Sequence, residues 1–383
     1  MWGNFIIGYT DTDLAQVDRG LYGANGYYAS SDVTSSGENK VMLGGFAAEP
    51  GTISGRDEYR GTGGSLYYLR HQDILIGSDR LRIEIRDKDS GVVIGVKNLT
   101  PAIDYDIDYI QGRILLSEPL SSIADDNLLV QETSLSGNPL FLVARYEYTP
   151  GFDEINDVAV GGRAHYWLND QVKLGVTTSR QDEADIENSL SGVDLTLRRN
   201  AGTWLKAEFA SSEGDGSGAL NSSDGGFNFN PLDQGLNSNN TADAYRIEAS
   251  TRLEEMFKGT PGSASVYVQN REAGFSAPGQ LTSTDVEQYG GKLNMAITER
   301  TSLNVKADSR DQKDSINVVA VDADADYVLD ENWRLSAGGR FDTREDNSID
   351  VPVTQKQGDR LDLAFEATYD SQRDWLAYGC LLY

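Results

Sequence analysis

The sequence predicts an all-β protein: an antiparallel, up-and-down transmembrane β-barrel of about 16 strands or more, with an inserted small β-sandwich-like domain. The first observation behind this is the strict alternation of apolar and polar side chains in residues 317–342. The second is the length of such segments, about ten residues or more against five or six for an average strand. The third is a regular alternation of short and long connections between them.

Residues 317–329 carry the alternation most clearly. The apolar residues of one parity are Val319, Val321, Ala323, Ala325, Tyr327 and Leu329. Asp322, Asp324 and Asp326 occupy the other parity. Successive side chains of a strand point to opposite faces, so this strand has an apolar face and an acidic face. The alternation resumes after a break at 330–332, which predicts a hairpin whose arms are long enough to cross a bilayer as tilted strands.

Composition restricts the class of protein. No run of about 18 apolar residues occurs in the 383 residues, which excludes a transmembrane helix. The mean hydropathy of -0.45 does not exclude a barrel, since half of the membrane residues of a barrel face a polar lumen. The net charge of -27 argues against nucleic acid as a partner. The single cysteine, Cys380, rules out an internal disulfide framework.

The beginning of the chain predicts three strands, within 1–9, 21–28 and 40–47. We expect residues 1–48 to form the first barrel strands. No leader with a basic and then an apolar part opens the chain, so we expect that a leader was removed or that the sequence is a fragment. A cluster of glycine, proline and charge at 49–64 then interrupts the alternation and marks a domain boundary.

Residues 49–138 predict a separate small β-domain, a plug or a periplasmic module. Its strands are shorter, rich in valine, isoleucine and leucine, and joined by compact turns such as 88–91. Asp104, Asp106 and Asp108 alternate in one of these strands and could bind calcium. An edge strand with a solvated acidic face is the favoured interpretation, because Ca²⁺ needs six or more oxygen ligands converging from a loop.

Residues 139–383 predict the main run of barrel strands. The expected strands are 139–148, 156–168, 171–180, 189–200, 202–211, 241–253, 262–271, 284–297, 301–310, 315–329, 333–344, 357–370 and 374–383. Short connections alternate with the long ones at 181–188, 212–240, 272–283 and 345–356. Outer-membrane barrels have short periplasmic turns and long external loops. Counting back along the chain from the short connections, with 139–148 included as a barrel strand, places residues 49–138 on the side of the short connections.

The sequence shows no motif that indicates catalytic or metal-binding residues. The only two histidines, His71 and His165, have no second histidine or cysteine nearby, which argues against zinc. No G-x-S-x-G motif follows a strand, and the glycine-rich runs lack the lysine and helix of a phosphate loop. We therefore expect no catalytic residue, no metal site, no cofactor and no enzyme activity.

Charged residues on the polar parity are the candidate lumen-facing residues. They are Lys206, Glu208, Arg246, Glu248, Lys306, Asp308, Asp322, Asp324, Asp326 and Arg340. Their mixed signs predict an interior that is closed by ion pairs or open and weakly cation-preferring. If the opposite parity contacts lipid, Ala323→Arg should cost about 2–4 kcal/mol and Asp324→Arg much less.

The first third of the chain also resembles a known group of proteins. The runs GRDEYRGTGGSLYYLRHQDILIGSDRLRIEIRDKDSG and LTPAIDYDIDYIQGRILLSEPL, with RGLYGANGYY before them, carry the resemblance, which covers about residues 1–136. They are similar to a segment of large Gram-negative outer-membrane or cell-surface proteins labelled uncharacterised, OmpA-family or TonB-receptor-like. The resemblance implies a β-domain in or beside an outer-membrane barrel, and it brings no substrate.

Two functions of different classes follow. The first is an outer-membrane barrel acting as a pore, transporter or export conduit, with outer-membrane lipid and other envelope proteins as its expected partners. The second is a soluble or fibre-forming surface β-protein used for adhesion or as a scaffold. The sequence identifies no transported solute.

Overall fold

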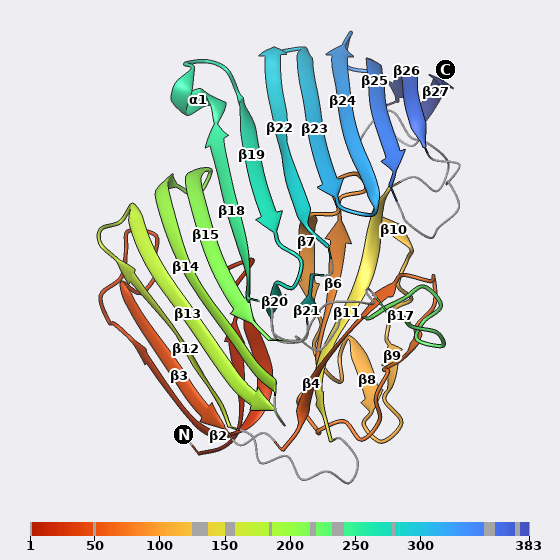
Figure 1. The fold of residues 1–383 in the computed structure, drawn as a ribbon. Helices are drawn as coiled ribbons and strands as arrows, with labels where there is room; N and C mark the ends of the chain where they lie inside the picture. The colour runs from red at the N-terminus through yellow and green to blue at the C-terminus, as the bar shows by residue number, and fades with distance from the viewer. Residues whose placement is uncertain are drawn as a thin grey trace.

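The computed structural model describes residues 2–48, 51–124, 137–149, 158–183, 186–214, 220–231, 241–277, 280–282, 284–347, 357–371 and 376–382. These residues form one large sheet, three smaller sheets and one short helix, α1 (Leu253–Met256) (Figure 1). In this part of the chain no helix is both long and apolar enough to span a membrane.

The large sheet has fifteen strands, every neighbouring pair antiparallel. In spatial order they are β1 (Trp2–Tyr9), β2 (Val17–Ala29), β3 (Val41–Ala48), β12 (Ala159–Trp167), β13 (Val172–Glu183), β14 (Ile186–Asn200), β15 (Thr203–Glu213), β18 (Thr241–Arg252), β19 (Gly262–Arg271), β22 (Val286–Thr298), β23 (Thr301–Gln312), β24 (Ile316–Val328), β25 (Trp333–Asp346), β26 (Gly358–Asp370) and β27 (Leu376–Leu382).

The structure confirms the predicted all-β class and the large antiparallel sheet. The strand predicted at 315–329 is Ile316–Val328, and the one predicted at 357–370 is Gly358–Asp370. The described strands do not close into a barrel, since β1 and β27 are the two ends of the order. Parts of the predicted connections 212–240 and 345–356 lie outside the described residues.

The second sheet has seven strands. They are β17 (Asn230–Pro231), β16 (Leu220–Ser222), β4 (Ile53–Arg60), β11 (Asn138–Tyr148), β6 (Arg80–Arg86) and β7 (Val93–Asn98), with β10 (Ile123–Ala124) paired to β11. A three-stranded sheet contains β5 (Leu66–Tyr68), β9 (Arg113–Leu116) and β8 (Tyr105–Asp108), and β20 (Ser276–Ala277) pairs with β21 (Gln280–Leu281). The second and third sheets enclose a common core that includes Tyr59, Tyr67, Ile114 and Leu142.

Strand β11 belongs to a different sheet from the one expected. Residues 139–148 were expected among the barrel strands, but β11 pairs with β4 and β6 and does not enter the large sheet. Most of its side chains are buried, because the core covers one face, and on the other face Arg145 and Glu147 form ion pairs with Asp18 and Arg19 of β2 in the large sheet. The region that is distinct from the large sheet thus extends past the predicted boundary at 138.

Because β11 is not a strand of the large sheet, the small sheets lie at the end of the large sheet opposite to the one expected. Ala48 at the end of β3 pairs with Ala159 at the start of β12, and Ala159 pairs with Gln181 near the end of β13. The chain between β3 and β12 therefore leaves the large sheet on the side where the long connection 214–240 lies. Short connections such as 329–332 lie on the opposite side. The backward count was wrong by one strand because it included β11.

Strand β2 pairs with β1 through its first half and with β3 through its second half. The two halves meet at Gly23, whose φ is +157° and where a Cβ would lie 2.4 Å from the carbonyl oxygen of Ala47. Only glycine fits this close approach. Phe5 and Ile7 of β1 form one buried cluster with Phe46 of β3 and Ala159 of β12.

Candidate functional site

The ten charged residues predicted to face a lumen lie on one face of the large sheet. Residues directly opposite each other in an antiparallel sheet point to the same side. Glu208 is opposite Arg246, Lys306 is opposite Asp322, and Asp322 is opposite Arg340. We call this surface the charged face.

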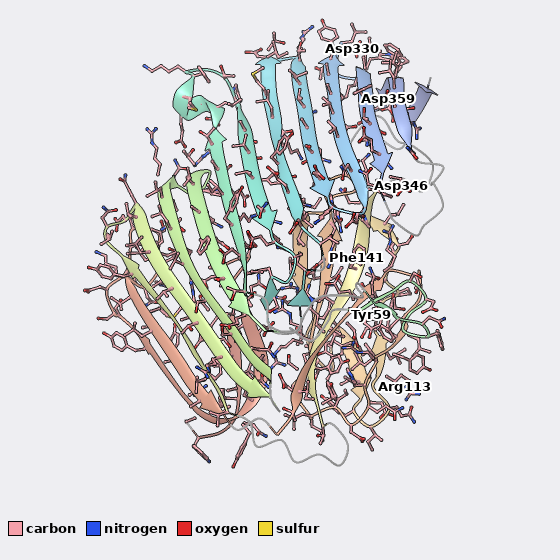
Figure 2. All side chains as sticks on the ribbon, viewed as in Figure 1. Tyr59, Arg113, Phe141, Asp330, Asp346 and Asp359 are labelled. Carbon is pink, nitrogen blue, oxygen red and sulfur yellow. The ribbon has the colours of Figure 1, made fainter. Side chains whose placement is uncertain are left out.

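The opposite surface, which we call the apolar face, has the reverse character. Large apolar side chains along β14 to β26 are exposed there, including Val193, Phe209, Tyr289, Val321 and Phe341. Figure 2 shows the side chains along the strands of the large sheet. Charged groups are buried and apolar groups are exposed, the inverse of a sheet in a water-soluble protein.

A turn of the second sheet docks on the charged face. This docking turn, residues 87–92, joins β6 to β7. The Asp87 carboxylate accepts hydrogen bonds from the backbone N–H groups of Asp89 and Ser90, at 3.0 and 2.9 Å. Gly91 adopts a φ of +70°, and a Cβ there would lie 2.9 Å from the guanidinium of Arg310. The turn is thus closed by Asp87 and is narrow enough to reach the sheet.

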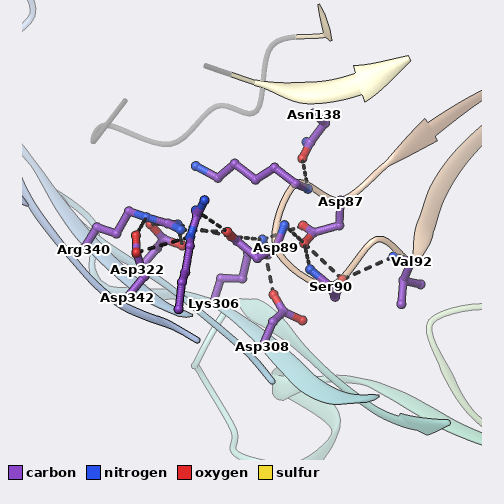
Figure 3. A network of polar contacts seen from close by, with 12 residues as sticks. Asp87, Asp89, Ser90, Val92, Asn138, Lys306, Asp308, Asp322, Arg340 and Asp342 are labelled. Carbon is purple, nitrogen blue, oxygen red and sulfur yellow. Dashed lines mark hydrogen bonds and ion pairs between the residues drawn. The ribbon is translucent and has the colours of Figure 1, made fainter. Parts of the chain in front are cut away.

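Arg340 of β25 is the centre of the docked interface (Figure 3). Its guanidinium lies 2.7 Å from Asp89, 2.8 Å from Asp322 and 2.9 Å from Asp342. Arg340 is 1 % exposed, and the three carboxylates are buried as well. A buried charge is stable only when it is paired and hydrogen-bonded, so this cluster depends on all of its members.

Lys306 of β23 makes a second connection to the docking turn. Its ammonium lies 2.5 Å from Asp87, 3.4 Å from Asp89 and 3.2 Å from Asp308 (Figure 3). The side-chain amide of Gln288 donates to the carbonyl oxygen of Ser90 at 2.5 Å. The charged face therefore holds the turn through side chains from three of its strands, β22, β23 and β25.

The pKa of Asp89 follows from this environment. Burial alone would raise the pKa of its carboxyl, but the hydrogen bond and charge of Arg340, followed by the charge of Lys306, outweigh burial and lower that pKa below its usual value. A lowered carboxyl pKa stabilises the folded state above the unfolded pKa, and this stabilisation is lost as the pH falls through the folded pKa. The contribution of Asp89 to the docked interface is therefore lost in acid.

The connection between β1 and β2 docks on the same face. Asp11 pairs with Arg163 of β12 at 2.7 Å, and Asp13 pairs with Arg246 at 3.1 Å. Glu208 accepts hydrogen bonds from the backbone N–H groups of Asp13 and Leu14, at 2.8 and 3.1 Å. Two separate segments of the chain thus use the residues of the charged face as their binding surface.

The remaining predicted residues have local partners. Asp324 accepts a hydrogen bond from Asn304 at 2.9 Å, and Asp326 accepts one from Ser336 at 2.6 Å. Glu248 pairs with Arg246 at 2.9 Å. Lys206 is exposed, and its ammonium lies 4.8 Å from the ring centroid of Trp204.

Sequence reasoning missed the partners of the charged face. Asp89 lies in a compact turn and Asp13 in a short connection, and neither position shows an alternation that could indicate a face. The long connection 212–240 also has an unexpected role, because β16 within it pairs in parallel with β4. Phe229 of the same connection packs on Tyr59, with ring centroids 5.9 Å apart.

His71 is partly buried beside the core of the small sheets. Its Nδ1 lies 2.9 Å from the hydroxyl of Tyr146, which donates to the buried carboxylate of Asp57 at 2.6 Å. The ring stacks on Tyr148, with centroids 3.6 Å apart. Burial, with the charge of Arg70 as a second cause, lowers the pKa of His71 to about 4.

Replacing His71 with phenylalanine is expected to remove a pH dependence of stability. The unfolded chain binds a proton at His71 near pH 6.5, whereas the folded chain binds it near pH 4, so wild-type stability falls between these values as the pH falls. The phenylalanine variant retains the stacking on Tyr148 but does not titrate. Urea unfolding midpoints should therefore show wild type losing stability relative to the variant from pH 7.5 to pH 5. A constant difference between the two proteins would contradict this.

No group of three or more histidine, cysteine, aspartate or glutamate side chains is placed to hold a metal ion among the described residues. Comparison of the chain with family models, curated proteins and solved structures finds no match. Fold and site therefore define the class by themselves: an all-β protein whose large sheet exposes an apolar face and docks other parts of the chain on a charged face.

Proposed function

We propose that the large sheet is part of the wall of a β-barrel in a bacterial outer membrane. The protein would act there as a pore, transporter or export conduit. Lipid would contact the apolar face, and the charged face would line the lumen, where the small sheets are docked. The observation that carries this proposal is the inverted distribution of side chains on the two faces.

The size of the inversion supports a lipid environment. Val266, Leu361 and Phe365 are 59 %, 64 % and 55 % exposed, while Asp322 is 3 % exposed. Each Å² of apolar surface left in water costs about 25 cal/mol, and continuous apolar patches beyond a few hundred Å² are rare on water-soluble proteins. A bilayer removes this cost, because its hydrocarbon core is apolar.

Strand length supports the same conclusion. β22, β24 and β26 each have 13 residues and β25 has 14. A tilted strand needs about 9–11 residues to cross a bilayer, so each of these strands spans the hydrocarbon core and extends beyond it. The backbone groups of the internal strands are paired with both neighbours, as a membrane requires.

Cell fractionation and gel migration test the proposal. The full chain, produced with an outer-membrane export signal, is expected in the outer-membrane fraction and to resist extraction with alkaline carbonate. An unheated sample in detergent should migrate differently from a boiled one, because a folded barrel stays intact in mild detergent. A chain that is monomeric and folded without detergent would contradict the proposal and favour the surface adhesion or scaffold protein.

A further inference from the structure

A cavity of about 420 Å³ lies between the second sheet and the charged face of the large sheet. It is lined by more basic than acidic side chains, although the whole chain has a net charge of -27. The basic residues are Arg56, Arg82, Arg86, Arg246, Arg271 and Arg310, and the acidic residues are Asp13, Glu58, Glu84 and Glu248. A basic cavity in so acidic a chain is the exception that needs an explanation.

Each carboxylate of the cavity forms an ion pair with at least one of four arginines. Within the second sheet Glu58 pairs with Arg56 and Arg86, both at 2.7 Å. Glu84 likewise pairs with Arg82 at 2.6 Å and with Arg86 at 2.7 Å. On the large sheet Arg246 forms ion pairs with both Asp13 and Glu248.

Arg271 and Arg310 are left without a carboxylate among the residues that the structure describes. The Nε atom of each is buried and has no hydrogen-bond partner there. Arg310 donates to the side-chain oxygen of Gln312, which is neutral. A partly buried guanidinium without an anion is costly, so an anionic ligand that pairs with it offsets part of this cost.

The two guanidiniums are placed to act together. Arg271 is at the end of β19 and Arg310 is on β23, with β22 between them. Neighbouring strands are about 4.8 Å apart, so the two backbones are about 10 Å apart and two long side chains can meet on one ligand. Thr282 also lines this cavity and offers a hydroxyl group to the rest of a solute.

We propose that this cavity binds the oxyanion group of a small solute, a carboxylate or a phosphate, between Arg271 and Arg310. The planar guanidinium matches both anions with two parallel hydrogen bonds, which a chloride ion cannot accept in the same way. The cavity is formed by the chain itself, so the inference does not depend on insertion of the large sheet into a membrane.

Titration calorimetry on the purified full chain tests this inference. Inorganic phosphate and citrate are the two probes, added at constant ionic strength with chloride as the balancing anion. Wild type should bind at least one of them, and the one bound identifies the anion class. The double variant Arg271→Gln, Arg310→Gln should bind it at least tenfold more weakly, and Arg334→Gln, at an exposed arginine of β25, should bind it as wild type does.

A thermal unfolding series separates loss of binding from loss of folding. The double variant should unfold at the same temperature as wild type or higher, because it lacks two partly buried charges that have no carboxylate partner. The bound probe should raise the unfolding temperature of wild type only. Absence of binding to wild type, equal binding to the double variant, or an equal effect of chloride would each overturn the inference.

Discussion

Replacing Arg340 with methionine is expected to destabilise the folded chain by about 3–5 kcal/mol, the cost of removing one partner from a buried ion cluster. Asp89, Asp322 and Asp342 would remain buried without the guanidinium that holds them at 2.7 to 2.9 Å. The docking turn would lose its ion pair with β25. Denaturant unfolding of the purified chain measures the change in the free energy of unfolding.

Two further variants make this result specific. Arg334→Met changes the same residue type on the same strand, at an exposed position, and should cost less than about 0.5 kcal/mol. Combining Arg340→Met with Asp89→Asn and Asp322→Asn removes most of the stranded charge and should recover part of the loss. If Arg340→Met costs no more than Arg334→Met, the cluster does not hold the two sheets together.

Replacing Val266 with arginine is expected to cost about 2–4 kcal/mol when the chain is folded in lipid. Val266 lies in the middle of β19 on the apolar face and is 59 % exposed. A charge near the centre of the bilayer must leave water, whereas the same charge on a solvated sheet would not. Folding titrations into lipid vesicles measure the cost.

Ser265→Arg is the matched control, because Ser265 is the preceding residue on the charged face, opposite Lys292. It should cost less than about 1 kcal/mol, mostly from repulsion by Lys292. The pair Ala323 and Asp324 is less suitable than the sequence suggested, since Asp324 is buried and bonded to Asn304, so that its replacement has a cost of its own. Equal tolerance at Val266 and Ser265 would remove the membrane interpretation.

The positions and faces of the long strands were accessible from the sequence. The alternation of Val319, Val321 and Tyr327 with Asp322 and Asp324 placed β24 within one residue at each end and separated its two faces correctly. This succeeds because alternation is a property of each strand alone: a period of two assigns every side chain to a face without knowledge of its partner.

The sheet to which β11 belongs was not accessible in the same way. Its segment NPLFLVARYEY is long enough for a barrel strand, and strand length does not identify the neighbour. Its sequence did differ in one respect, since NPLFLVA is a nearly continuous apolar run, which is typical of a strand covered on both faces. The side on which the small sheets attach depended on this assignment.

The partners of the charged face were decided by the tertiary structure alone. Sequence alternation placed Arg340 and Lys306 on one polar surface, but Asp89 is 251 residues from Arg340 along the chain. Local sequence determines which side of a strand a charge occupies, because the backbone geometry repeats every two residues. Which opposite charge it meets depends on how distant segments pack, since an ion pair forms only where folding buries both groups within a few ångströms of each other.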